Sequence, residues 1–577
     1  MKLNQPPNPE SLVTIKQMVE QNAARFAAGV AFQAKKDGIY QRVTYGEVYH
    51  VVESLAAGLK AQGVGRGDRI ALLSENRIEW ALAYLSIIYA GAVVVPLDAM
   101  ITVESLTTIL NESGARGIIL AGRFLNMVLH ARSDLPALNL IINLDARENY
   151  EGVQAYPRLV EVAFHSTEKP AEIKLDDLAA IVYTSGTTGI AKGVMLTHGN
   201  IMSNVYAVYS MFKVDHHDNF LSVLPLHHTF ECTAGFLAPF YAGARITYAE
   251  GFKSYQLLAN MQETGVTIMC GVPLMYRLFY DGIQREIQAR GPLAVVTFGL
   301  LTVAAKMAKW LFKKNIGRTL FRSFHKKIGG KLRFWVAGAA ATDPAVIHGF
   351  DVFGVTIIQG YGLTEASPII AACTEEHNRR GSVGRPLSGV EVKIFRPDRH
   401  GIGEIIARGP NIMQGYYQRP DLTAEVIKDG WLYTGDLGYL DRDGYLFITG
   451  RSKDLIVTGS GVNVYPEEIE FRLGRIPLIK EACVLGLKLE KGVHRGGEEV
   501  LAVVFPDLAY CESFLRQKGL TPTREIIEEM IHEEIRKLND RTAEFQRIMQ
   551  TRIVYNELPK TSTRKVKRHE LRKELGL

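Results

Sequence analysis

Residues 184–193 read Thr-Ser-Gly-Thr-Thr-Gly-Ile-Ala-Lys-Gly, and this stretch decides how the rest of the chain is interpreted. The apolar run 178–183 precedes it and the shorter run 194–196 follows it, so we expect two buried strands joined by this loop. Glycines and hydroxyl residues present backbone N–H and side-chain donors to a phosphate, and a lysine adds positive charge. The loop is not a Walker A motif, because no glycine directly precedes Lys192 and no serine or threonine follows it. It predicts a phosphate-binding loop, with a plain glycine-rich hairpin as the alternative.

Length and composition indicate a soluble globular chain of more than one domain. Its 577 residues exceed the length at which a single core keeps growing. A net charge of +6 is too small to make the whole surface a nucleic-acid footprint. The five cysteines show no metal-binding spacing, which favours a reducing, cytoplasmic compartment. We expect no signal peptide in residues 1–9, and we expect the apolar run 293–305 to be too short to span a bilayer.

The order of the expected elements predicts an α/β fold. Helical patterns at residues 45–62 and 79–90 flank an apolar strand at 69–73, which is typical of βα units and a parallel sheet. Short strands separated by turn signals begin near residue 390, and a small α+β pattern follows residue 450. We therefore expect a large N-terminal domain of βα layers over 1–450, with a β-rich subdomain from about 390, and a small α+β domain over 451–577.

A second motif, Gln-Gly-Tyr-Gly-Leu-Thr-Glu at residues 359–365, follows a strand-like run. Its glycines allow a ligand to approach the backbone closely, and Tyr361 suits stacking on a base. Thr364 suits a phosphate, and Glu365 suits a hard cation such as Mg²⁺. A tight turn with a surface glutamate is the alternative for this motif taken alone.

Two further motifs carry charge. Residues 433–436, Tyr-Thr-Gly-Asp, end in a carboxylate that suits two ribose hydroxyls, and Arg451 lies fifteen residues further on. Residues 559–566, Pro-Lys-Thr-Ser-Thr-Arg-Lys-Val, lie in a basic C-terminal tail. Each of these also fits a plainer reading, a common turn for the first and a solvated tail for the second.

In their order and context, the four motifs resemble those of the adenylate-forming superfamily, which comprises acyl-CoA synthetases, aryl-CoA ligases, luciferases and the adenylation domains of peptide synthetases. The resemblance extends from about residue 20 to 572 and includes segments 74–76 and 90–97 and the turn 338–340. It implies an enzyme that uses ATP and Mg²⁺, and a C-terminal domain that moves. Among the branches, the chain is most similar to long-chain fatty acid–CoA ligases.

The resemblance also implies how ATP is bound. Thr184 and Glu365 would hold Mg²⁺, the 338–340 turn and Tyr361 would flank adenine, and Asp436 would bind the ribose with help from its arginine. The ATP-binding residues implied in this way are Thr184, Ser185, Gly186, Thr187, Thr188, Gly189, Lys192, Gly338, Ala339, Ala340, Gly360, Tyr361, Gly362, Thr364, Asp436 and Arg451.

The same resemblance implies a catalytic lysine and a hinge. Lys565 matches the lysine that stabilises charge on the carboxylate and α-phosphate while pyrophosphate leaves. Lys453 matches the hinge about which the C-terminal domain rotates, and the loop around Gly461 would then shape the thiol tunnel. The implied catalytic residues are Lys565, Lys192, Thr184 and Glu365.

Two positions depart from the family pattern. Ala191 stands where a proline usually precedes the loop lysine, so we expect a softer loop with its chemistry intact. Arg564 stands where a glycine usually precedes the C-terminal lysine, which changes the local backbone freedom and adds charge.

The substrate is indicated by a histidine motif. Residues 225–231, Pro-Leu-His-His-Thr-Phe-Glu, are similar to the family motif that lines the acyl entrance. The implied substrate contacts are His228, Gly338 and Gly362. We expect a medium- or long-chain fatty acid as the substrate and coenzyme A as the acceptor, used by a cytoplasmic enzyme.

A basic segment supports a lipid substrate. Residues 287–342 contain no Asp or Glu, and lysines and arginines between 306 and 327 accompany apolar residues at helical spacing. This pattern predicts a basic amphipathic helix that contacts the inner membrane surface, with a solvated helix packed on the enzyme as the alternative.

Other functions stay open at this point. The acid could be aromatic, and the acceptor could be a carrier-protein phosphopantetheine instead of coenzyme A. A non-catalytic lipid- or nucleotide-binding homologue is a further alternative. We expect no nucleic-acid partner, and the oligomeric state is open, with a homodimer among the candidates.

Overall fold

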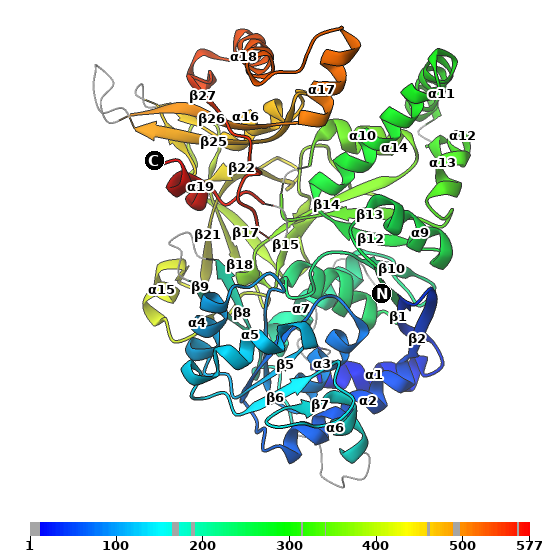
Figure 1. Cartoon of the computed structure of the whole chain (residues 1–577), viewed down its shortest axis with the longest axis vertical. Helices are drawn as coiled ribbons and strands as arrows, with labels where there is room; N and C mark the ends of the chain where they lie inside the picture. The colour runs from blue at the N-terminus through cyan, green and yellow to red at the C-terminus, as the bar shows by residue number, and fades with distance from the viewer. Residues whose placement is uncertain are drawn as a thin grey trace. The chain divides into compact units, whose positions relative to one another are not determined.

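The computed structural model describes residues 12–163, 172–185, 191–312, 315–340, 342–458, 462–488, 497–561 and 565–577 (Figure 1). The chain forms two compact units. Unit 1 comprises Met1–Val392 and Ala407–Leu432, and unit 2 comprises Lys393–Ile406 and Tyr433–Leu577. The β-rich segment is thus grouped partly with the C-terminal segment, whereas the sequence places a boundary at residue 451. The division into two units follows contacts within each unit and does not locate a hinge, so the domain boundary at residue 451 stays a prediction.

One sheet of unit 1 is mainly parallel, with the order β19-β9-β8-β4-β3-β5-β6-β7. Strands β3 to β8 pair in parallel, and β9 pairs antiparallel with both β8 and β19. The strands are β3 (Arg69–Leu73), β4 (Val93–Pro96), β5 (Gly117–Leu120), β6 (Leu140–Asn143), β7 (Gln154–Ala155), β8 (Leu178–Ser185), β9 (Ala191–Thr197) and β19 (Gly415–Tyr416).

The second sheet of unit 1 has the order β16-β15-β14-β13-β12-β10-β11-β1-β2. Its centre, from β14 to β1, is parallel, so the carboxyl ends of β10, β12, β13 and β14 meet at one edge. The strands are β1 (Val30–Lys36), β2 (Ile39–Thr44), β10 (Asn219–Ser222), β11 (Arg245–Tyr248), β12 (Ile268–Gly271), β13 (Phe334–Ala337), β14 (Thr356–Gly362), β15 (Ile369–Ala372) and β16 (Arg385–Pro386).

Helices cover these sheets, as expected for βα layers (Figure 1). Several begin at a side-chain cap; the Thr44 hydroxyl, for example, accepts from the Glu47 N–H at the start of α2. The helices are α1 (Ile15–Phe26), α2 (Tyr45–Ala61), α3 (Ile78–Tyr89), α4 (Val103–Ser113), α5 (Leu125–His130), α6 (Tyr156–Ala163), α7 (His198–Met211), α8 (Ala238–Tyr241), α9 (Ser254–Thr264), α10 (Pro273–Ala289), α11 (Pro292–Phe312), α12 (Gly317–Leu320), α13 (Arg322–Lys327), α14 (Pro344–Val352) and α15 (Pro420–Val426).

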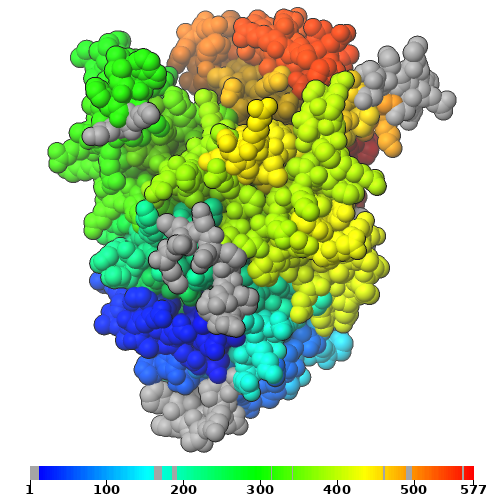
Figure 2. Space-filling model, turned by 180° about the vertical axis from the view of Figure 1, so that it is seen from behind, coloured from blue at the N-terminus to red at the C-terminus, as the bar shows by residue number. Residues whose placement is uncertain are grey.

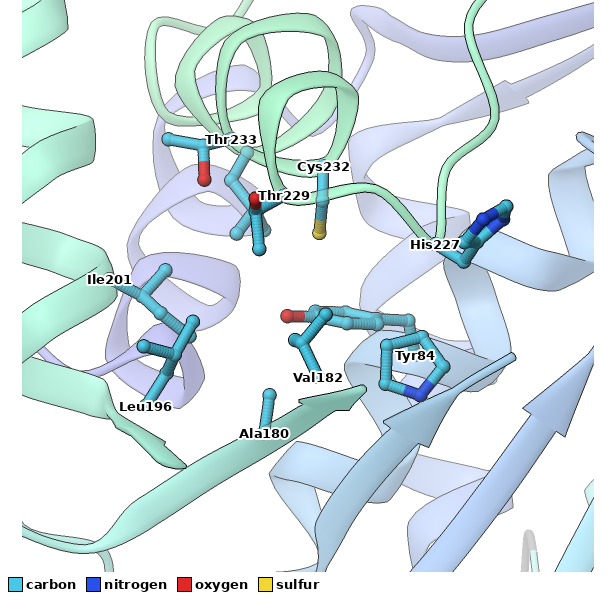
Figure 3. A pocket seen from close by; sticks show the side chains of 11 residues that line it. Tyr84, Ala180, Val182, Leu196, Ile201, His227, Thr229, Cys232 and Thr233 are labelled. Atoms are coloured by element: carbon cyan, nitrogen blue, oxygen red, sulfur yellow. The ribbon is translucent and has the colours of Figure 1, made fainter. Parts of the chain in front are cut away.

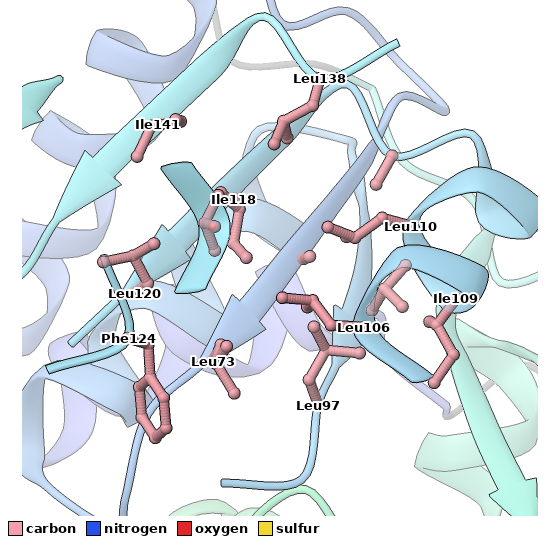
Figure 4. Packing of buried hydrophobic residues seen from close by; sticks show 14 of the residues in the cluster. Leu73, Leu97, Leu106, Ile109, Leu110, Ile118, Leu120, Phe124, Leu138 and Ile141 are labelled. Atoms are coloured by element: carbon pink, nitrogen blue, oxygen red, sulfur yellow. The ribbon is translucent and has the colours of Figure 1, made fainter. Parts of the chain in front are cut away.

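The aliphatic side chains expected to be buried form the core of the first sheet. Leu73 on β3, Ile118 on β5 and Ile141 on β6 pack with Leu106 and Leu110 of α4, and each of these side chains is almost fully buried (Figure 4). Burial of such side chains stabilises a fold by roughly 1.5–3 kcal/mol each. The α/β fold class predicted from the alternating pattern is confirmed.

Three strands cross the boundary between the units along the chain: β17 (Glu391–Phe395), β18 (Gly403–Arg408) and β21 (Trp431–Leu440). In unit 1, the short β20 (Ile427–Lys428) pairs with the start of β21, and in unit 2 the rest of β21 pairs with β22 (Leu446–Arg451). The remaining elements of unit 2 are β23 (Ile456–Val457), β24 (Asn463–Val464), α16 (Pro466–Leu473), β25 (Ile479–Lys488), β26 (Glu498–Pro506), α17 (Leu508–Gln517), α18 (Arg524–Asp540), β27 (Gln550–Ile553) and α19 (Arg568–Glu574).

The structure corrects two expectations about the basic region. The apolar run 293–305 belongs to α11, a helix of 21 residues, and among the described residues this helix alone is long and apolar enough to cross a membrane. The apolar run taken alone is too short to span a bilayer, but the helix continues beyond it, through Lys306 and Lys309, to Phe312. Conversely, the segment 306–327 is not one amphipathic helix, because α11 ends at Phe312 and Phe321 is buried in the core between α12 and α13.

A carboxylic acid lies in the core of unit 1. Glu231 begins a π-helical turn, Glu231–Leu237, and is fully buried. The Ser222 hydroxyl donates to Glu231 Oε1 at 2.6 Å, and Oε2 is buried without a hydrogen-bond partner. Burial raises the pKa of this carboxyl to about 8, although hydrogen bonds from Ser222 and from the Val223 backbone oppose the shift. We therefore expect Glu231 to be protonated at neutral pH.

This raised pKa predicts a pH dependence of stability. The unfolded chain releases the Glu231 proton near the ordinary value of 4.5 and the folded chain near pH 8, so the folded state binds more protons between these limits. The free energy of unfolding contributed by this group should fall as the pH rises from about 4.5 to 8, by roughly 1.4 kcal/mol per pH unit. In the Glu231→Gln variant that slope should disappear, which denaturant unfolding at several pH values measures. Equal slopes in the variant and the parent would contradict the assignment.

Candidate functional site

The expected phosphate-binding loop connects β8 to β9. These strands pair antiparallel with Thr184 opposite Lys192 and Ser185 opposite Ala191, so the hydroxyl and the lysine lie side by side where the loop begins and ends. Gly193 is required there, because a Cβ would lie 2.9 Å from Ile181 Cγ2. The predicted loop residues Gly186, Thr187, Thr188 and Gly189 lie outside the described residues.

Lys192 belongs to a cluster that the sequence did not reveal. Its ammonium lies 5.0 Å from the centre of the Tyr416 ring, and the Tyr416 hydroxyl donates to Glu365 Oε1 at 2.8 Å. Burial and the nearby Glu365 raise the pKa of the Tyr416 hydroxyl, which keeps it protonated. Tyr416 reaches this place because β19 pairs with β9, and the Gly415-Tyr416-Tyr417 run alone gave no sign of that pairing. The tyrosine thus connects the loop lysine to the second motif.

Two other motifs meet at the carboxyl ends of β13 and β14. Ala337 of β13 pairs with Gln359 of β14, so the turn 338–340 and the motif 359–365 leave the sheet together. A Cβ on Gly338 would lie 2.8 Å from the Phe230 ring, which brings the histidine motif against this turn. Gly338 is buried, whereas Ala339 and Ala340 are exposed. Ala339 has a φ of 68°, a left-handed conformation that is uncommon for alanine and recurs at ligand-binding turns.

The second motif makes its own close contacts. A Cβ on Gly362 would lie only 1.9 Å from the Pro368 carbonyl oxygen, whereas one on Gly360 would find its nearest atom at 3.6 Å. Gly362 is therefore a structural necessity and Gly360 is not. Tyr361 pairs with Ala371 across β14 and β15. The Thr364 hydroxyl lies 3.4 Å from the hydroxyl of Thr229, a second contact between this motif and the histidine motif.

His228 is held in its neutral form. Burial and, to a smaller extent, the neighbouring His227 lower its pKa to about 3, while Asp98 opposes the shift. His227 Nε2 lies 3.5 Å from Asp98 Oδ2, and the two imidazole rings lie 4.3 Å apart. A neutral imidazole offers a donor and an acceptor without charge, which suits contact with an acyl group.

A small apolar pocket adjoins this motif, with room for about one water molecule. Thr229 and Cys232 point into it from one side, and the Tyr84 ring lies across from them (Figure 3). Aliphatic side chains complete its wall. The lining residues are Tyr84, Pro96, Ala180, Val182, Leu196, Ile201, His227, Thr229, Cys232, Thr233 and Leu237.

In unit 2, the third motif forms a charged pair. Asp436 on β21 is opposite Arg451 at the end of β22, and Arg451 Nε donates to Asp436 Oδ1 at 2.9 Å. Asp436 is buried, and the arginine is about half exposed. Lys453, the predicted hinge residue, is exposed in the turn that follows β22. Gly461 lies outside the described residues.

Lys565 lies beside this pair. Burial of the ammonium and the nearby cation Arg451 lower the pKa of Lys565, while Asp436 and Asp454 oppose the shift. The residue as a whole retains an exposed surface, so the crowding concerns its charged end. The lowered pKa means that the charged ammonium is disfavoured in these surroundings. An anion bound next to it would stabilise the ammonium.

A hairpin holds Lys565 in place. The Thr561 N–H donates to the Lys565 carbonyl at 2.9 Å, and the Lys565 N–H donates to the Thr561 hydroxyl at 3.1 Å. On one side of this hairpin, Lys560 forms an ion pair with Glu481, and both side chains are largely buried. The predicted departure Arg564 lies outside the described residues.

The other side of the hairpin is held by Arg568, which sequence reasoning missed. Arg568 Nη2 donates to both carboxylate oxygens of Glu470, at 2.7 and 2.9 Å, and Nη1 lies 3.3 Å from Asp454 Oδ2. These partners come from α16 and from the turn after β22, so their proximity follows only from the fold. Arg568 is therefore a positioning residue for Lys565.

Comparison with known proteins identifies the family of the chain. The sequence pattern of the family described as "AMP-binding enzyme" matches residues 19–417. The chain is 32% identical to "Long chain acyl-CoA synthetase 7, peroxisomal" of Arabidopsis thaliana over 75% of its length, and it spans 65% of that protein. It is 30% identical to "Long-chain-fatty-acid–CoA ligase FadD15" of Mycobacterium bovis, over 79% of this chain and 77% of that one.

A solved structure supports the fold. The crystal structure of the anthranilate CoA ligase AuaEII in complex with anthranoyl-AMP superposes with a TM-score of 0.77, at 23% identity and over 98% of both chains. By name the relatives are a long-chain acyl-CoA synthetase and a long-chain-fatty-acid–CoA ligase, and the fold is shared with the anthranilate CoA ligase. On the family match and these relatives, the chain belongs to the family of AMP-binding enzymes.

Proposed function

We propose that the protein activates a medium- or long-chain fatty acid with ATP. The acid's carboxylate oxygen attacks the α-phosphate, which forms acyl-AMP and releases pyrophosphate. The thiolate of coenzyme A then attacks the acyl carbon, which forms the thioester and releases AMP. The observation that carries this proposal is the placement of Lys565 beside the Asp436–Arg451 pair. The relatives named above support the fatty acid and coenzyme A as substrates.

The residues of the chain fit this chemistry. A carboxylate is a poor acyl donor because its leaving group would be oxide, and adenylation supplies a better one. The reaction needs positioning and charge neutralisation more than covalent catalysis. Lys192 would neutralise phosphate charge next to the loop, and Lys565 would stabilise the charge that develops at the α-phosphate. Asp436 would accept hydrogen bonds from the ribose hydroxyls.

The chain also offers ligands that fit Mg²⁺. This ion prefers carboxylate and hydroxyl oxygens, and Thr184 and Glu365 supply them. Glu365 Oε1 accepts from the Tyr416 hydroxyl, which orients the carboxylate and leaves its other oxygen for a cation. Bound Mg²⁺ would supply charge neutralisation of the ATP phosphates.

We further propose that unit 2 carries a moving part. In this proposal the segment 451–577 rotates about Lys453 after adenylation, and the loop containing Gly461 then replaces Lys565 to shape the thiol tunnel. The position of Lys453 in an exposed turn directly after β22 supports a hinge there.

The nature of the acid and acceptor follows from the same observations. The small, mostly apolar pocket lined by His227 and Thr229 of the histidine motif supports an apolar acyl chain, which would have to widen it. An aromatic acid, a carrier-protein acceptor and a non-catalytic homologue are the rival outcomes. We also propose a cytoplasmic enzyme that contacts the inner membrane surface through the basic residues between 306 and 327, and a homodimer is compatible with this arrangement.

The function is tested by ATP-dependent pyrophosphate release across acids from acetate to oleate plus benzoate, with and without coenzyme A. We expect the highest rate with long aliphatic acids and sustained turnover only with coenzyme A. A burst without turnover would indicate another acceptor, and a preference for benzoate would indicate an aryl ligase. Background rates with every acid would support the non-catalytic homologue.

The role of Lys565 predicts a split between the two half-reactions. Lys565→Ala should lower adenylation by at least a hundredfold, because the developing charge at the α-phosphate loses its partner. Thioester formation from preformed acyl-AMP should change little. Lys567→Ala is the matched control, since Lys567 is two residues away and pairs with Glu570 at 2.8 Å. An equal loss in both half-reactions would contradict the two-conformation proposal.

The contact of Tyr416 with Glu365 predicts a change in metal dependence. Tyr416→Phe removes the hydroxyl that orients the Glu365 carboxylate. We expect the Mg²⁺ concentration needed for half-maximal adenylation to rise several-fold, with a smaller change in the rate at saturating Mg²⁺. Tyr417→Phe, the adjacent residue, serves as the control. If both variants respond equally, the orienting role is wrong.

A further inference from the structure

Helix α11 presents an uninterrupted apolar stripe to solvent. Trp310 is 81% exposed, Leu293 80% and Leu300 67%. The stripe, here called the α11 stripe, consists of Leu293, Val296, Leu300, Val303, Met307 and Trp310. Its members follow one another at intervals of three and four residues, so they lie on one face of the helix. A row of six large exposed apolar side chains without a charge is unusual on a soluble surface and marks an interaction site.

The opposite face of α11 is attached to unit 1. Phe298 packs at 5.7 Å from the rings of both Phe321 and Phe353, and Ala305 is almost fully buried. Near the end of the helix, Lys309 Nζ lies 2.5 Å from Asp351 Oδ2. α11 also contacts α10 and α14, although part of it projects beyond them (Figure 1). To cross a bilayer the helix would have to give up all of these contacts, so the structure favours a helix that lies on a surface.

The helical lobe that carries the stripe is rich in positive charge. Residues 287–342 contain no acid. Lys306 and Lys309 lie on α11 itself, and Arg318, Arg322, Lys326 and Lys327 belong to the α12–α13 segment, which packs against the other face of α11 through Phe321. Two of them are neutralised, Lys309 by Asp351 and Lys327 by Glu286. The helical segments from α10 to α13 stand out as a green lobe of unit 1 in Figure 2. An apolar row on a lobe rich in cations complements a surface with a negative exterior and an apolar interior.

We propose that the α11 stripe inserts into an anionic lipid bilayer, with the helix lying parallel to the membrane plane in the headgroup region. Trp310, beside the lysines at the end of the helix, suits this interface because its ring is apolar and its N–H is polar. The stripe would enter the apolar layer by about 5–10 Å while the lysines remain among the phosphates. The inference deepens the proposed function and rests on it for its biological sense, because a long-chain acid partitions into lipid. It also assigns the inserting part of the proposed membrane contact to α11, whose last turns belong to the segment 306–327.

The four tryptophans allow a direct test. Trp80 and Trp335 are buried, and Trp431 is partly buried on β21, whereas Trp310 is the most exposed. The purified full chain is mixed with vesicles of phosphatidylcholine and phosphatidylglycerol (3:1), in which the lipids carry bromine at a shallow or a deep acyl position. We expect tryptophan quenching, stronger from the shallow bromine. Trp310→Phe should abolish the quenching while vesicle sedimentation persists.

Sedimentation measures the contribution of the stripe itself. Leu300→Gln combined with Val303→Gln should weaken binding to these vesicles at least tenfold, and pure phosphatidylcholine vesicles should bind the parent less. Ile39→Gln is the matched control, because Ile39 is a 73% exposed apolar residue on β2, outside the stripe. Equal binding by the double variant and the control would overturn the proposal, as would absence of parent binding.

The rival occupant is a second copy of the chain. A dimer in solution that the double variant abolishes, without vesicle binding by the parent, would overturn the bilayer in favour of a dimer interface. Stronger quenching from the deep bromine would overturn the parallel orientation. None of these measurements requires catalytic turnover. A loss of membrane binding can therefore be distinguished from an absence of ligase activity.

Discussion

The candidate site of unit 1 depends on the close approach of three chain segments. A Cβ at Gly338 would meet the Phe230 ring at 2.8 Å, and a Cβ at Gly362 would meet the Pro368 carbonyl oxygen at 1.9 Å. Only glycine permits these distances, so the turn after β13, the motif after β14 and the histidine motif can converge at one edge of the sheet. The hydroxyls of Thr229 and Thr364 then lie 3.4 Å apart. The chemistry of the site therefore starts from backbone packing.

In unit 2 the corresponding constraint is electrostatic. Lys565 lies between two other cations of the chain, Lys560 and Arg568. Their positive charges repel one another, so carboxylates at fixed positions are needed to hold this segment in place. The bidentate contact of Arg568 with Glu470 and the pair Lys560–Glu481 anchor the two ends of the hairpin. Partly buried pairs of this kind resist salt more than exposed ones do. The hairpin consequently holds a lysine ready for an anion instead of leaving it on a solvated tail.

Much of the fold and of the site could be predicted from the sequence because the signals were local. The strand at 69–73 and the helix after Thr44 have the expected periods and caps, and the glycine-rich motifs lie where strands end. Tyr416 and Arg568 could not be predicted, because each meets its partner only through long-range pairing. The expectation of one basic amphipathic helix over 306–327 failed for a similar reason. Phe321 and Ile328 have the right spacing, but their apolar face is turned into the core.

α11 shows why composition alone cannot decide between a crossing and a surface helix. Mean hydropathy counts every residue equally, whichever face of the helix it lies on. The core face and the exposed stripe of α11 together therefore give the mean hydropathy of a membrane-spanning segment. Packing separates the faces: Phe298 and Ala305 belong to the core, and Leu300 and Trp310 have no protein neighbour that buries them. A face that the protein itself buries provides no driving force for insertion, because its transfer out of water has already occurred. The free energy available to a membrane is that of the outer stripe alone, which suffices for a reversible interfacial contact and is smaller than that of a spanning helix.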